Sequence, residues 1–378
     1  MKIGILGGGQ LGRMLALAAY PLGIQAELYD PSPDACAGQV ASLLSAPYDD
    51  HATLARLAEG KVCITYEFEN VPIETARWLA ERIPVRPTPR ALELFQDRLY
   101  EKQFLNSIGV PTPAFAPVDP HCPEAALEVV GLPCVVKTRR FGYDGKGQGV
   151  ARTREEFHTL LQQLQPHALI AEAFVAFDRE VSVLGVRSLS GELAFYPLVE
   201  NHHREGILRV SIVNPPETPT DDALWRTATD YLTRLLQTLE YVGVVALEMF
   251  QVGTQLLANE VAPRVHNSGH WSIEGAETSQ FENHVRAITG LPLGSVALRG
   301  YSAMVNLIGE LPPIEAVLRI PNAHLHLYGK SPRPGRKLGH ITIRADTRAE
   351  RDALLRQTLE ACGIRLESVL AALSTSSV

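Results

Sequence analysis

The first hundred residues alternate between short apolar runs and longer segments whose apolar positions recur with a helical period. Short apolar runs bounded by turn residues are typical of strands, and a 3.6-residue period is typical of amphipathic helices. Strands are predicted at residues 2–6, 25–29 and 62–66, and helices at residues 11–22, 73–83 and 91–108. Strands separated by helices predict an open, mostly parallel α/β sheet.

Prolines crowd residues 111–123, which interrupts this pattern and predicts a domain boundary. Antiparallel pairing is expected in the part that follows. Strands are predicted at residues 134–137, 169–172, 180–187, 193–198 and 207–212, a hairpin at 244–252 and 255–261, and further strands near 303–307, 324–328 and 340–343. Helices are predicted at residues 155–164, 222–239 and 279–289. This mixture indicates an α+β region after the α/β region.

The chain has 378 residues, of which 46% are hydrophobic and 20% charged, enough for two to three globular domains. A net charge of −7 argues against general binding to nucleic acid or to an anionic membrane surface, because both need a basic face. No apolar run spans a bilayer, and the N-terminal residues lack the features of a signal peptide. Five scattered cysteines without a C-x-x-C pair favour a reducing compartment, so we expect a cytoplasmic protein.

A glycine-rich turn joins the first predicted strand to the first predicted helix. Gly7, Gly9 and Gly12 match the G-x-G-x-x-G fingerprint of dinucleotide-binding folds, and Asp30 follows the second strand. Backbone N–H groups at such a helix N-terminus can hold a phosphate. A nicotinamide-dependent oxidoreductase is therefore one hypothesis, and a tight turn without a ligand is the alternative. The oxidoreductase hypothesis uses only the first 30 residues and leaves the later clusters without a role.

A second glycine-rich segment covers residues 137–149, where Lys137 ends a predicted strand and four glycines follow within eight residues. Such a loop can close over a triphosphate with its N–H groups while the lysine supplies a fixed positive charge. The spacing differs from G-x-x-x-x-G-K-[ST], so the loop is not a Walker P-loop. The alternative is a flexible basic loop on the surface.

Two acids lie on the strands of the predicted hairpin. Glu248 and Glu260 are symmetric about residue 254, so we expect them to be nearly opposite one another. Two carboxylates at that distance repel unless a cation lies between them, and magnesium favours carboxylates together with phosphate oxygens. A shift of one residue in the register would move the acids to opposite faces of the hairpin.

Polar residues crowd the loop after the second acidic strand, at residues 259–270, which contain an arginine, two histidines, two asparagines and a serine. A guanidinium beside a metal site suits a carboxylate or a phosphoryl transition state. Zinc is not expected, because neither cysteine nor H-E-x-x-H accompanies the acids. A basic cluster at residues 328–340 is interpreted either as a phosphomonoester site or as a solvated turn.

These stretches together resemble the N5-carboxyaminoimidazole ribonucleotide synthases, a family of the ATP-grasp superfamily that acts in de novo purine synthesis. The matching stretches are residues 7–14, 66–72, 137–148, 259–270, 279–282 and 335–340, and they occur in family order. The string Asn-Glu-Val-Ala-Pro-Arg-Val-His-Asn-Ser-Gly-His at residues 259–270 is highly specific.

The resemblance implies both a fold and a reaction. The fold is α/β and α+β, with a Rossmann-like preATP-grasp domain at residues 1–108, an ATP-grasp lid subdomain at 109–188, and a C-terminal subdomain with the metal and substrate sites at 189–378. The mobile lid would shield the intermediate, carboxyphosphate, from water. The enzyme would use ATP, magnesium (manganese as an alternative) and bicarbonate to carboxylate the 5-amino group of aminoimidazole ribonucleotide, and a homodimer is expected.

The resemblance also assigns roles to single residues. Lys137 and Arg264 would be catalytic, with Arg264 holding bicarbonate, and Glu248 and Glu260 would bind the metal. The ATP site would comprise Arg98, Lys137, Gly142, Tyr143, Asp144, Gly145, Lys146, Gly147, Gln148, Glu172, Ala173, Phe174, Val175, Glu180, His203, Asn259 and Glu260. The substrate site would comprise Glu67, Tyr143, Lys146, Arg264, His266, Asn267, Ser268, Lys330, Arg336 and Lys337. In this family the first domain binds no dinucleotide, and Gly7 to Gly12 would line the substrate side.

Two alternatives differ from this ligase. A binding protein without catalytic activity would not require Lys137, Glu248 and Glu260 together. Another ATP-grasp ligase, such as biotin carboxylase or the formate-using glycinamide ribonucleotide transformylase, would share the fold and take a different substrate, because a fold does not determine a function. ADP release that depends on aminoimidazole ribonucleotide would separate these hypotheses.

Overall fold

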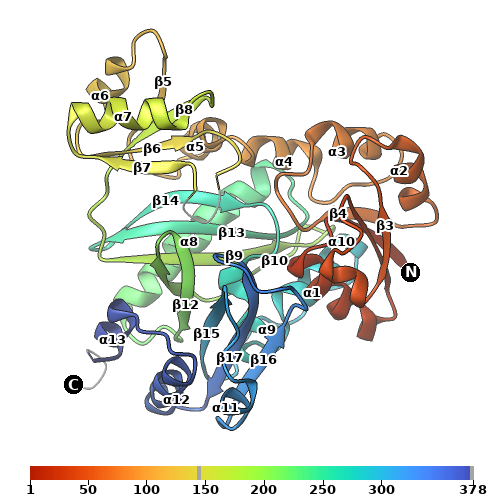
Figure 1. Cartoon of the computed structure of the whole chain (residues 1–378). Coiled ribbons are helices and arrows are strands. Elements are labelled where there is room, and N and C mark those ends of the chain that lie inside the picture. Colours follow the sequence, from red (N-terminus) through yellow and green to blue (C-terminus); the bar gives the residue numbers. More distant parts are fainter. Residues whose placement is uncertain (143–145, 375–378) are drawn as a thin grey trace.

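A computed structural model describes residues 1–142 and 146–374, which form three sheets with helices packed around them (Figure 1). The N-terminal sheet lies at the right of Figure 1, a small sheet at the top left, and a large sheet runs through the centre. The α/β and α+β fold class predicted from the sequence is confirmed. Among the described residues, no helix is both long and apolar enough to cross a membrane.

The N-terminal sheet is parallel and has the strand order β3-β2-β1-β4. Its strands are β1 (Lys2–Leu6), β2 (Gln25–Asp30), β3 (Ser42–Ser45) and β4 (Cys63–Tyr66), and its helices are α1 (Gln10–Ala19), α2 (His51–Ala58) and α3 (Ile73–Ala80). The predicted strands at residues 2–6, 25–29 and 62–66 are therefore confirmed. The apolar strand residues are buried between helices on the two faces, as expected of a parallel sheet.

The single helix predicted over residues 91–108 is wrong, because the chain forms α4 (Pro89–Phe95) and α5 (Arg98–Ser107) with a break between them. Asp97 has extended backbone angles, and its carboxylate accepts a hydrogen bond from the Leu99 N–H at 3.0 Å. An aspartate that caps a helix in this way starts a new helix.

The small sheet is antiparallel with the order β5-β8-β6-β7. It comprises β5 (Phe115–Val118), β6 (Cys134–Thr138), β7 (Gln148–Ala151) and β8 (Leu169–Ala173), covered by α6 (Glu124–Val130) and α7 (Arg154–Leu164). The proline-rich stretch predicted as a boundary contains β5. Pro117 is tolerated there because β5 is an edge strand and a missing N–H costs no ladder bond on the open side.

The large sheet has nine strands within the described residues, in the order β14-β13-β9-β11-β12-β15-β17-β16 with β10 on β9. These strands are β9 (Arg179–Arg187), β10 (Leu193–Phe195), β11 (Val199–Arg204), β12 (Ile207–Val213), β13 (Gly243–Val252), β14 (Gln255–Ala262), β15 (Tyr301–Ile308), β16 (Ala323–Leu327) and β17 (Lys337–Ala345). The segment 109–188 predicted as the lid thus contains the small sheet and also β9 of the large sheet.

Helices cover the large sheet, and the first of them along the chain supports the hairpin that carries the two acids. These are α8 (Pro219–Thr238), α9 (Ser272–Gly275), α10 (Gln280–Thr289), α11 (Ile314–Leu318), α12 (Arg348–Ala361) and α13 (Glu367–Ser374). The buried residues of α8, Leu224, Ala228, Leu232, Leu235 and Leu236, follow a helical period and pack on β9, β13 and β14. One face of the hairpin is therefore held by an apolar core, and the other face is available for polar side chains.

A buried histidine connects the N-terminal sheet to the large sheet. The Val244 N–H of β13 donates to His284 Nδ1 at 3.1 Å, so Nε2 carries the proton and donates to Thr65 Oγ1 of β4 at 2.9 Å. Burial lowers the pKa of His284 to about 3, so this ring is neutral near pH 7. The neutral ring on α10 fixes the position of the first domain relative to the hairpin.

Candidate active site

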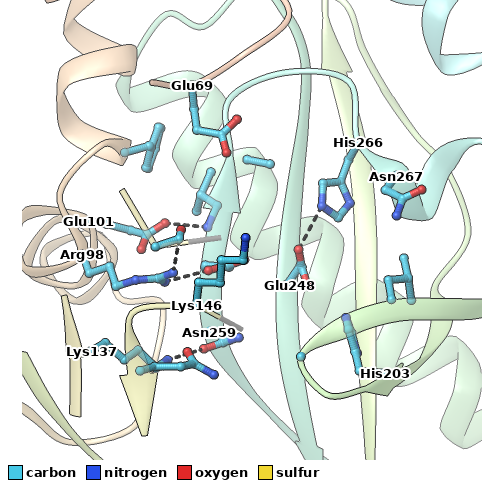
Figure 2. A pocket seen from close by; sticks show the side chains of 18 of the residues that line it. Glu69, Arg98, Glu101, Lys137, Lys146, His203, Glu248, Asn259, His266 and Asn267 are labelled. Carbon is cyan, nitrogen blue, oxygen red and sulfur yellow. Dashed lines mark hydrogen bonds and ion pairs between the residues drawn. The ribbon is translucent and has the colours of Figure 1, made fainter. Parts of the chain in front are cut away.

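A cavity of about 440 Å³ lies where the small sheet, the N-terminal domain and the β13–β14 hairpin meet. Figure 2 shows Arg98 and Lys137 on one side of it, His266 and Asn267 on the other, and Glu248 between them. Fourteen of the residues assigned by the resemblance line this cavity: Arg98, Lys137, Gly142, Lys146, Gln148, Glu180, His203, Glu248, Asn259, Glu260, Arg264, His266, Asn267 and Lys337. The structure therefore brings residues from distant parts of the sequence into one space.

The two acids of the hairpin are register partners, which confirms the predicted pairing. From the turn, pairs run from Val252 with Gln255 to Met249 with Ala258, and the register then shifts so that Glu248 is opposite Glu260. Asn259 is the extra residue of this β-bulge. Because a bulge places two residues of one strand opposite one residue of its partner, Asn259 and Glu260 both reach the cavity.

Glu260 forms an ion pair with Arg98 from the first turn of α5, with 2.6 Å between Glu260 Oε2 and Arg98 Nη1. Arg98 also donates to the carbonyl of Gly142 at 3.4 Å, at the start of the glycine-rich loop. Burial alone would raise the pKa of Glu260, but Arg98, Lys137 and His266 together lower it to about 2. Glu260 is therefore a carboxylate at neutral pH and is available to a cation.

Lys137, at the end of β6, belongs to a buried cluster of charges. Its ammonium lies 3.0 Å from Glu172 Oε2 and donates to Asn259 Oδ1 at 3.4 Å. Lys102 of α5 binds the same Glu172 oxygen at 3.3 Å. Burial lowers the pKa of Lys137 despite the attraction of Glu172, whereas the two ammonium groups lower the pKa of Glu172 to about 2. The cluster joins the small sheet, α5 and the bulge of β14.

His266 binds Glu248, with 2.9 Å between His266 Nε2 and Glu248 Oε1. The backbone N–H of Ser268 donates to His266 Nδ1 at 3.3 Å, and the Ser268 hydroxyl lies 2.9 Å from the same nitrogen. Since Nδ1 accepts, the proton of a neutral ring is on Nε2, the nitrogen that lies against Glu248. His266 therefore orients one of the two acids.

A row of buried polar side chains continues from Ser268 across the large sheet. Ser182 donates to the Ser268 hydroxyl at 2.7 Å, Asn201 donates to Ser182 at 2.8 Å, and Ser211 donates to Asn201 Oδ1 at 2.8 Å. Every donor in this row points toward His266. The row therefore supports the arrangement in which His266 Nδ1 is an acceptor.

Arg264 lines the cavity, but part of its guanidinium is already used. Its Nε donates to Glu69 in a very short contact, and Nη1 donates to the carbonyl of Val265 at 3.0 Å. Glu69 raises the pKa of Arg264, and Arg264 in turn lowers the pKa of Glu69. Glu69 belongs to the stretch 66–72 but was not assigned a role from the sequence. It holds the arginine predicted to bind bicarbonate.

Side-chain carboxylates occupy the glycine-rich turn of the first domain. Glu67 accepts hydrogen bonds from the N–H groups of Gly9 at 3.0 Å and Gly12 at 2.9 Å, and Asp30 accepts from Gly8 at 2.7 Å. A Cβ on Gly9 would lie only 2.7 Å from a Glu67 oxygen, so the turn needs glycine for its own carboxylate. The N–H groups that a dinucleotide phosphate would use are therefore taken, and the fingerprint has a structural explanation here.

Other predicted site residues lie outside the cavity lining. Among the described residues these are Glu67, Gly147, Glu172, Ala173, Phe174, Val175, Ser268, Lys330 and Arg336. Lys330 contacts the side chain of Gln10 on α1, and Arg336 donates to the carbonyl of Ser331 at 3.1 Å. Glu180 and His203, which do line it, pair at 3.2 Å. Tyr143, Asp144 and Gly145 lie outside the described residues.

Apart from Arg98, sequence reasoning missed the charged residues on one face of α5. Glu101 accepts a hydrogen bond from the Val261 N–H at 2.5 Å, Lys102 binds Glu172, and Asp97 pairs with Arg139 of the loop after β6 at 2.8 Å. Residues 97, 98, 101 and 102 recur at helical spacing, so they share one face of the helix. Charged residues on the buried side of a helix were the available signal.

The donor atoms around the hairpin suit a hard cation. Two carboxylates and the Asn259 amide face the cavity, and oxygen ligands of this kind favour magnesium. Within residues 1–142 and 146–374, no group of three His, Cys, Asp or Glu side chains is arranged to hold a metal by itself. The acids therefore fit an ion that also takes ligands from phosphate oxygens or water.

Three domain families match successive parts of the chain. The ribonucleotide synthetase preATP-grasp domain matches residues 1–96, the ATP-grasp domain matches residues 103–281, and the phosphoribosylaminoimidazole carboxylase C-terminal domain matches residues 302–354. The first match covers the N-terminal sheet, and the second contains the small sheet together with the β13–β14 hairpin.

Relatives and solved structures cover almost the whole chain. The N5-carboxyaminoimidazole ribonucleotide synthase of Pseudomonas aeruginosa is 49% identical over 350 residues, 92% of this chain and 96% of that protein. The corresponding synthetase structure from Thermus thermophilus has a TM-score of 0.91 and 57% identity, covering 95% and 98% of the two chains. An Aspergillus clavatus synthase in complex with ADP and 5-aminoimidazole ribonucleotide has a TM-score of 0.88 and 29% identity, covering 96% and 98%. The chain belongs to the N5-carboxyaminoimidazole ribonucleotide synthase family of ATP-grasp proteins.

Proposed function

We propose that this protein uses ATP and bicarbonate to carboxylate the 5-amino group of aminoimidazole ribonucleotide, releasing ADP and phosphate. The observation that carries the proposal is the convergence of Lys137 and the Glu248–Glu260 pair on one cavity. Family membership supports the choice of substrate, because the Aspergillus clavatus relative holds ADP and 5-aminoimidazole ribonucleotide. The product would be N5-carboxyaminoimidazole ribonucleotide.

ATP would lie along the small-sheet side of the cavity. Lys137 and Arg98 would contact its phosphates, and the loop of residues 142–148 would close over them. The segment Glu172, Ala173, Phe174 and Val175 would hold the adenine, and Glu180 with His203 would hold the ribose. Glu248 and Glu260 would bind magnesium, which when bound offsets the negative charge on the β- and γ-phosphates. Manganese is an alternative ion for the same acids.

Bicarbonate is a poor electrophile, so the reaction needs activation by ATP. A bicarbonate oxygen would attack the γ-phosphorus, the bond from that phosphorus to the bridging oxygen would break, and ADP would leave with the electron pair. Arg264, held by Glu69, would bind bicarbonate and the charge that develops on it. The carboxyphosphate formed would release carbon dioxide and phosphate. The 5-amino nitrogen would then attack the carbon dioxide and lose one proton.

The ribonucleotide would lie on the opposite side of the cavity. His266, Asn267, Lys146 and Lys337 line this side, and both polar side-chain atoms of Asn267 are buried without a hydrogen-bond partner among the described residues. A buried amide without a partner is costly and suits a polar ligand. Glu67, Ser268, Lys330 and Arg336 remain proposed substrate residues. A cytoplasmic location suits the five free cysteines, and a homodimer is also proposed.

The test is ADP release with magnesium, ATP and bicarbonate, measured with and without aminoimidazole ribonucleotide. Release that depends on the ribonucleotide supports the proposal. A folded Glu260→Ala variant should lose this release, and Glu128→Ala, a substitution of an exposed glutamate on α6, should keep it. If ADP is released at the same rate with and without the ribonucleotide, the protein is an ATP-grasp enzyme with a different substrate. Full activity in Glu260→Ala would contradict the metal assignment.

A further inference from the structure

Lys102 is a fully buried lysine that does not line the cavity, and it has no role in the reaction described above. Its ammonium binds Glu172 Oε2 at 3.3 Å and donates to the backbone carbonyl of Asn259 at 3.0 Å. Glu172 is on β8 of the small sheet, and Asn259 is the bulged residue of β14. Lysine is rarely buried completely, because removing its charge from water is costly unless the charge is paired. A specific reason for this charge is therefore required.

The reason lies in how one carboxylate is shared between two ammonium groups. Lys137, which does line the cavity, binds the same Glu172 oxygen at 3.0 Å. Arg98 also acts on Glu172, but its charge is balanced by its ion pair with Glu260. Without Lys102, Glu172 and Lys137 would form a neutral buried pair and would attract phosphate weakly. With Lys102 present, the three charges sum to one positive charge. That charge is on the side of the cluster that faces the cavity, because Lys137 is the member of the three that lines it.

We propose that Lys102 is a positioning residue that neutralises Glu172, so that the positive charge of Lys137 remains available to the phosphates of the nucleotide. The inference rests on the proposed function, because it takes ATP as the ligand of Lys137. Because Lys102 does not line the cavity, it would touch neither the nucleotide nor the reacting atoms. It acts through Glu172 and, by its bond to the Asn259 carbonyl, it also holds the bulge that presents Glu260.

A role of Lys102 through its charge and a merely structural role predict different effects when the charge of Lys102 or of Glu172 is removed. If Lys102 only satisfies the Asn259 carbonyl, an uncharged donor of similar length should replace it. If Lys102 acts by its charge, removing the negative charge of Glu172 should compensate for its loss. The variants Lys102→Met, Lys102→Gln, Glu172→Gln and the double variant Lys102→Met/Glu172→Gln separate these two cases.

The measurement is calorimetric binding of ADP and of adenosine to each variant at one magnesium concentration. The ratio of the two affinities reports the phosphate contribution and removes effects on the adenine pocket. We expect Lys102→Met and Lys102→Gln to lower this ratio about tenfold or more, since one unit charge at several ångströms inside a protein has at least this effect. We expect the double variant to return to within about threefold of the wild-type ratio.

The outcomes can be distinguished. A wild-type ratio in Lys102→Met, or recovery in Lys102→Gln without recovery in the double variant, would overturn the inference and leave the proposed function intact. If Lys102→Met does not fold, Glu172→Gln alone decides: the proposal requires a ratio equal to or above that of the wild type, and a lower ratio overturns it. If the wild type binds no ADP, the proposed function fails and the inference fails with it.

Discussion

Glu101 is a buried acid whose pKa is raised in the folded protein, and replacing it tests this shift quantitatively. Its side chain is 2% exposed, it accepts a hydrogen bond from the Val261 N–H, and it lines the cavity beside Glu260 and Arg98. Burial is the largest cause that raises the pKa of Glu101 to about 8, with Glu260 adding to the effect and Lys102 opposing it. In the folded protein most Glu101 side chains are therefore protonated at neutral pH.

The sign of the effect on stability follows from this pKa. In the unfolded chain the carboxyl loses its proton above its ordinary pKa of 4.5, whereas the folded protein keeps the proton until about 8. The free energy of unfolding of the wild type should therefore fall as the pH rises between these two values, by about 1.4 kcal/mol per pH unit. Glu101→Gln keeps an acceptor for the Val261 N–H and has no proton to lose. Its stability relative to wild type should rise by about 2 to 3 kcal/mol from about pH 5.5 to about pH 7.5.

The assay is the free energy of unfolding from urea titrations of both proteins at several pH values in this range. Glu128→Gln is the matched control, because Glu128 is exposed on α6 and does not line the cavity. The change with pH that Glu128→Gln shows is subtracted from the change that Glu101→Gln shows. A Glu101→Gln advantage that stays constant or shrinks as the pH rises would refute the reasoning. That result would mean that Glu101 is ionised in the folded protein at neutral pH.

Three further predictions concern activity and the domain contact. Lys137→Met should lower the rate of ADP release by about a hundredfold or more, because one positioned positive charge is removed from the cavity. The melting temperature should not fall to a corresponding degree, and measuring rate and melting temperature on the same variant checks this. Glu260→Gln should raise the magnesium concentration needed for half-maximal ADP release, and a chelator should stop the wild-type reaction. When the pH is lowered from about 7 to about 5, the free energy of unfolding of the wild type should fall by about 2 kcal/mol more than that of His284→Asn. The reason is that His284 takes up a proton in this range only in the unfolded chain. Equal losses of the two proteins in urea titrations would contradict this prediction.

Local patterns in the sequence were sufficient for most elements of the fold and for part of the site. Strands, helices and the hairpin leave a periodicity that can be read without tertiary information, as in residues 244–252 and 255–261. The break between α4 and α5 was missed because apolar residues keep a helical period across it, while the deciding feature is the side chain of Asp97. A single cap can override a long apolar pattern.

Contacts between distant segments could not be predicted in the same way. The turn at Gly7 to Gly12 has the same residues whether its N–H groups hold a phosphate or a carboxylate. Glu67 directly follows β4, the neighbour of β1 in the sheet, and only the fold shows that it fills the turn. Lys102 is similar, because a lysine at helical spacing is usually solvated, and its burial depends on both Glu172 and β14.

The pairing of Glu248 with Glu260 depends on the β-bulge at Asn259, which the symmetry of their numbers about residue 254 does not reveal. A two-residue turn at residues 253 and 254 would by itself place Glu248 opposite Asn259, with Glu260 on the other face. The alternation of buried residues contains the missing information: Leu256 and Ala258 face the α8 core, and the next buried residue is Val261, one position later than period two requires. An interrupted alternation implies an extra residue, and the two polar residues at the interruption are those that share the cavity. The register of the acids is therefore set by the apolar face of the strand, since the core determines where the bulge must occur.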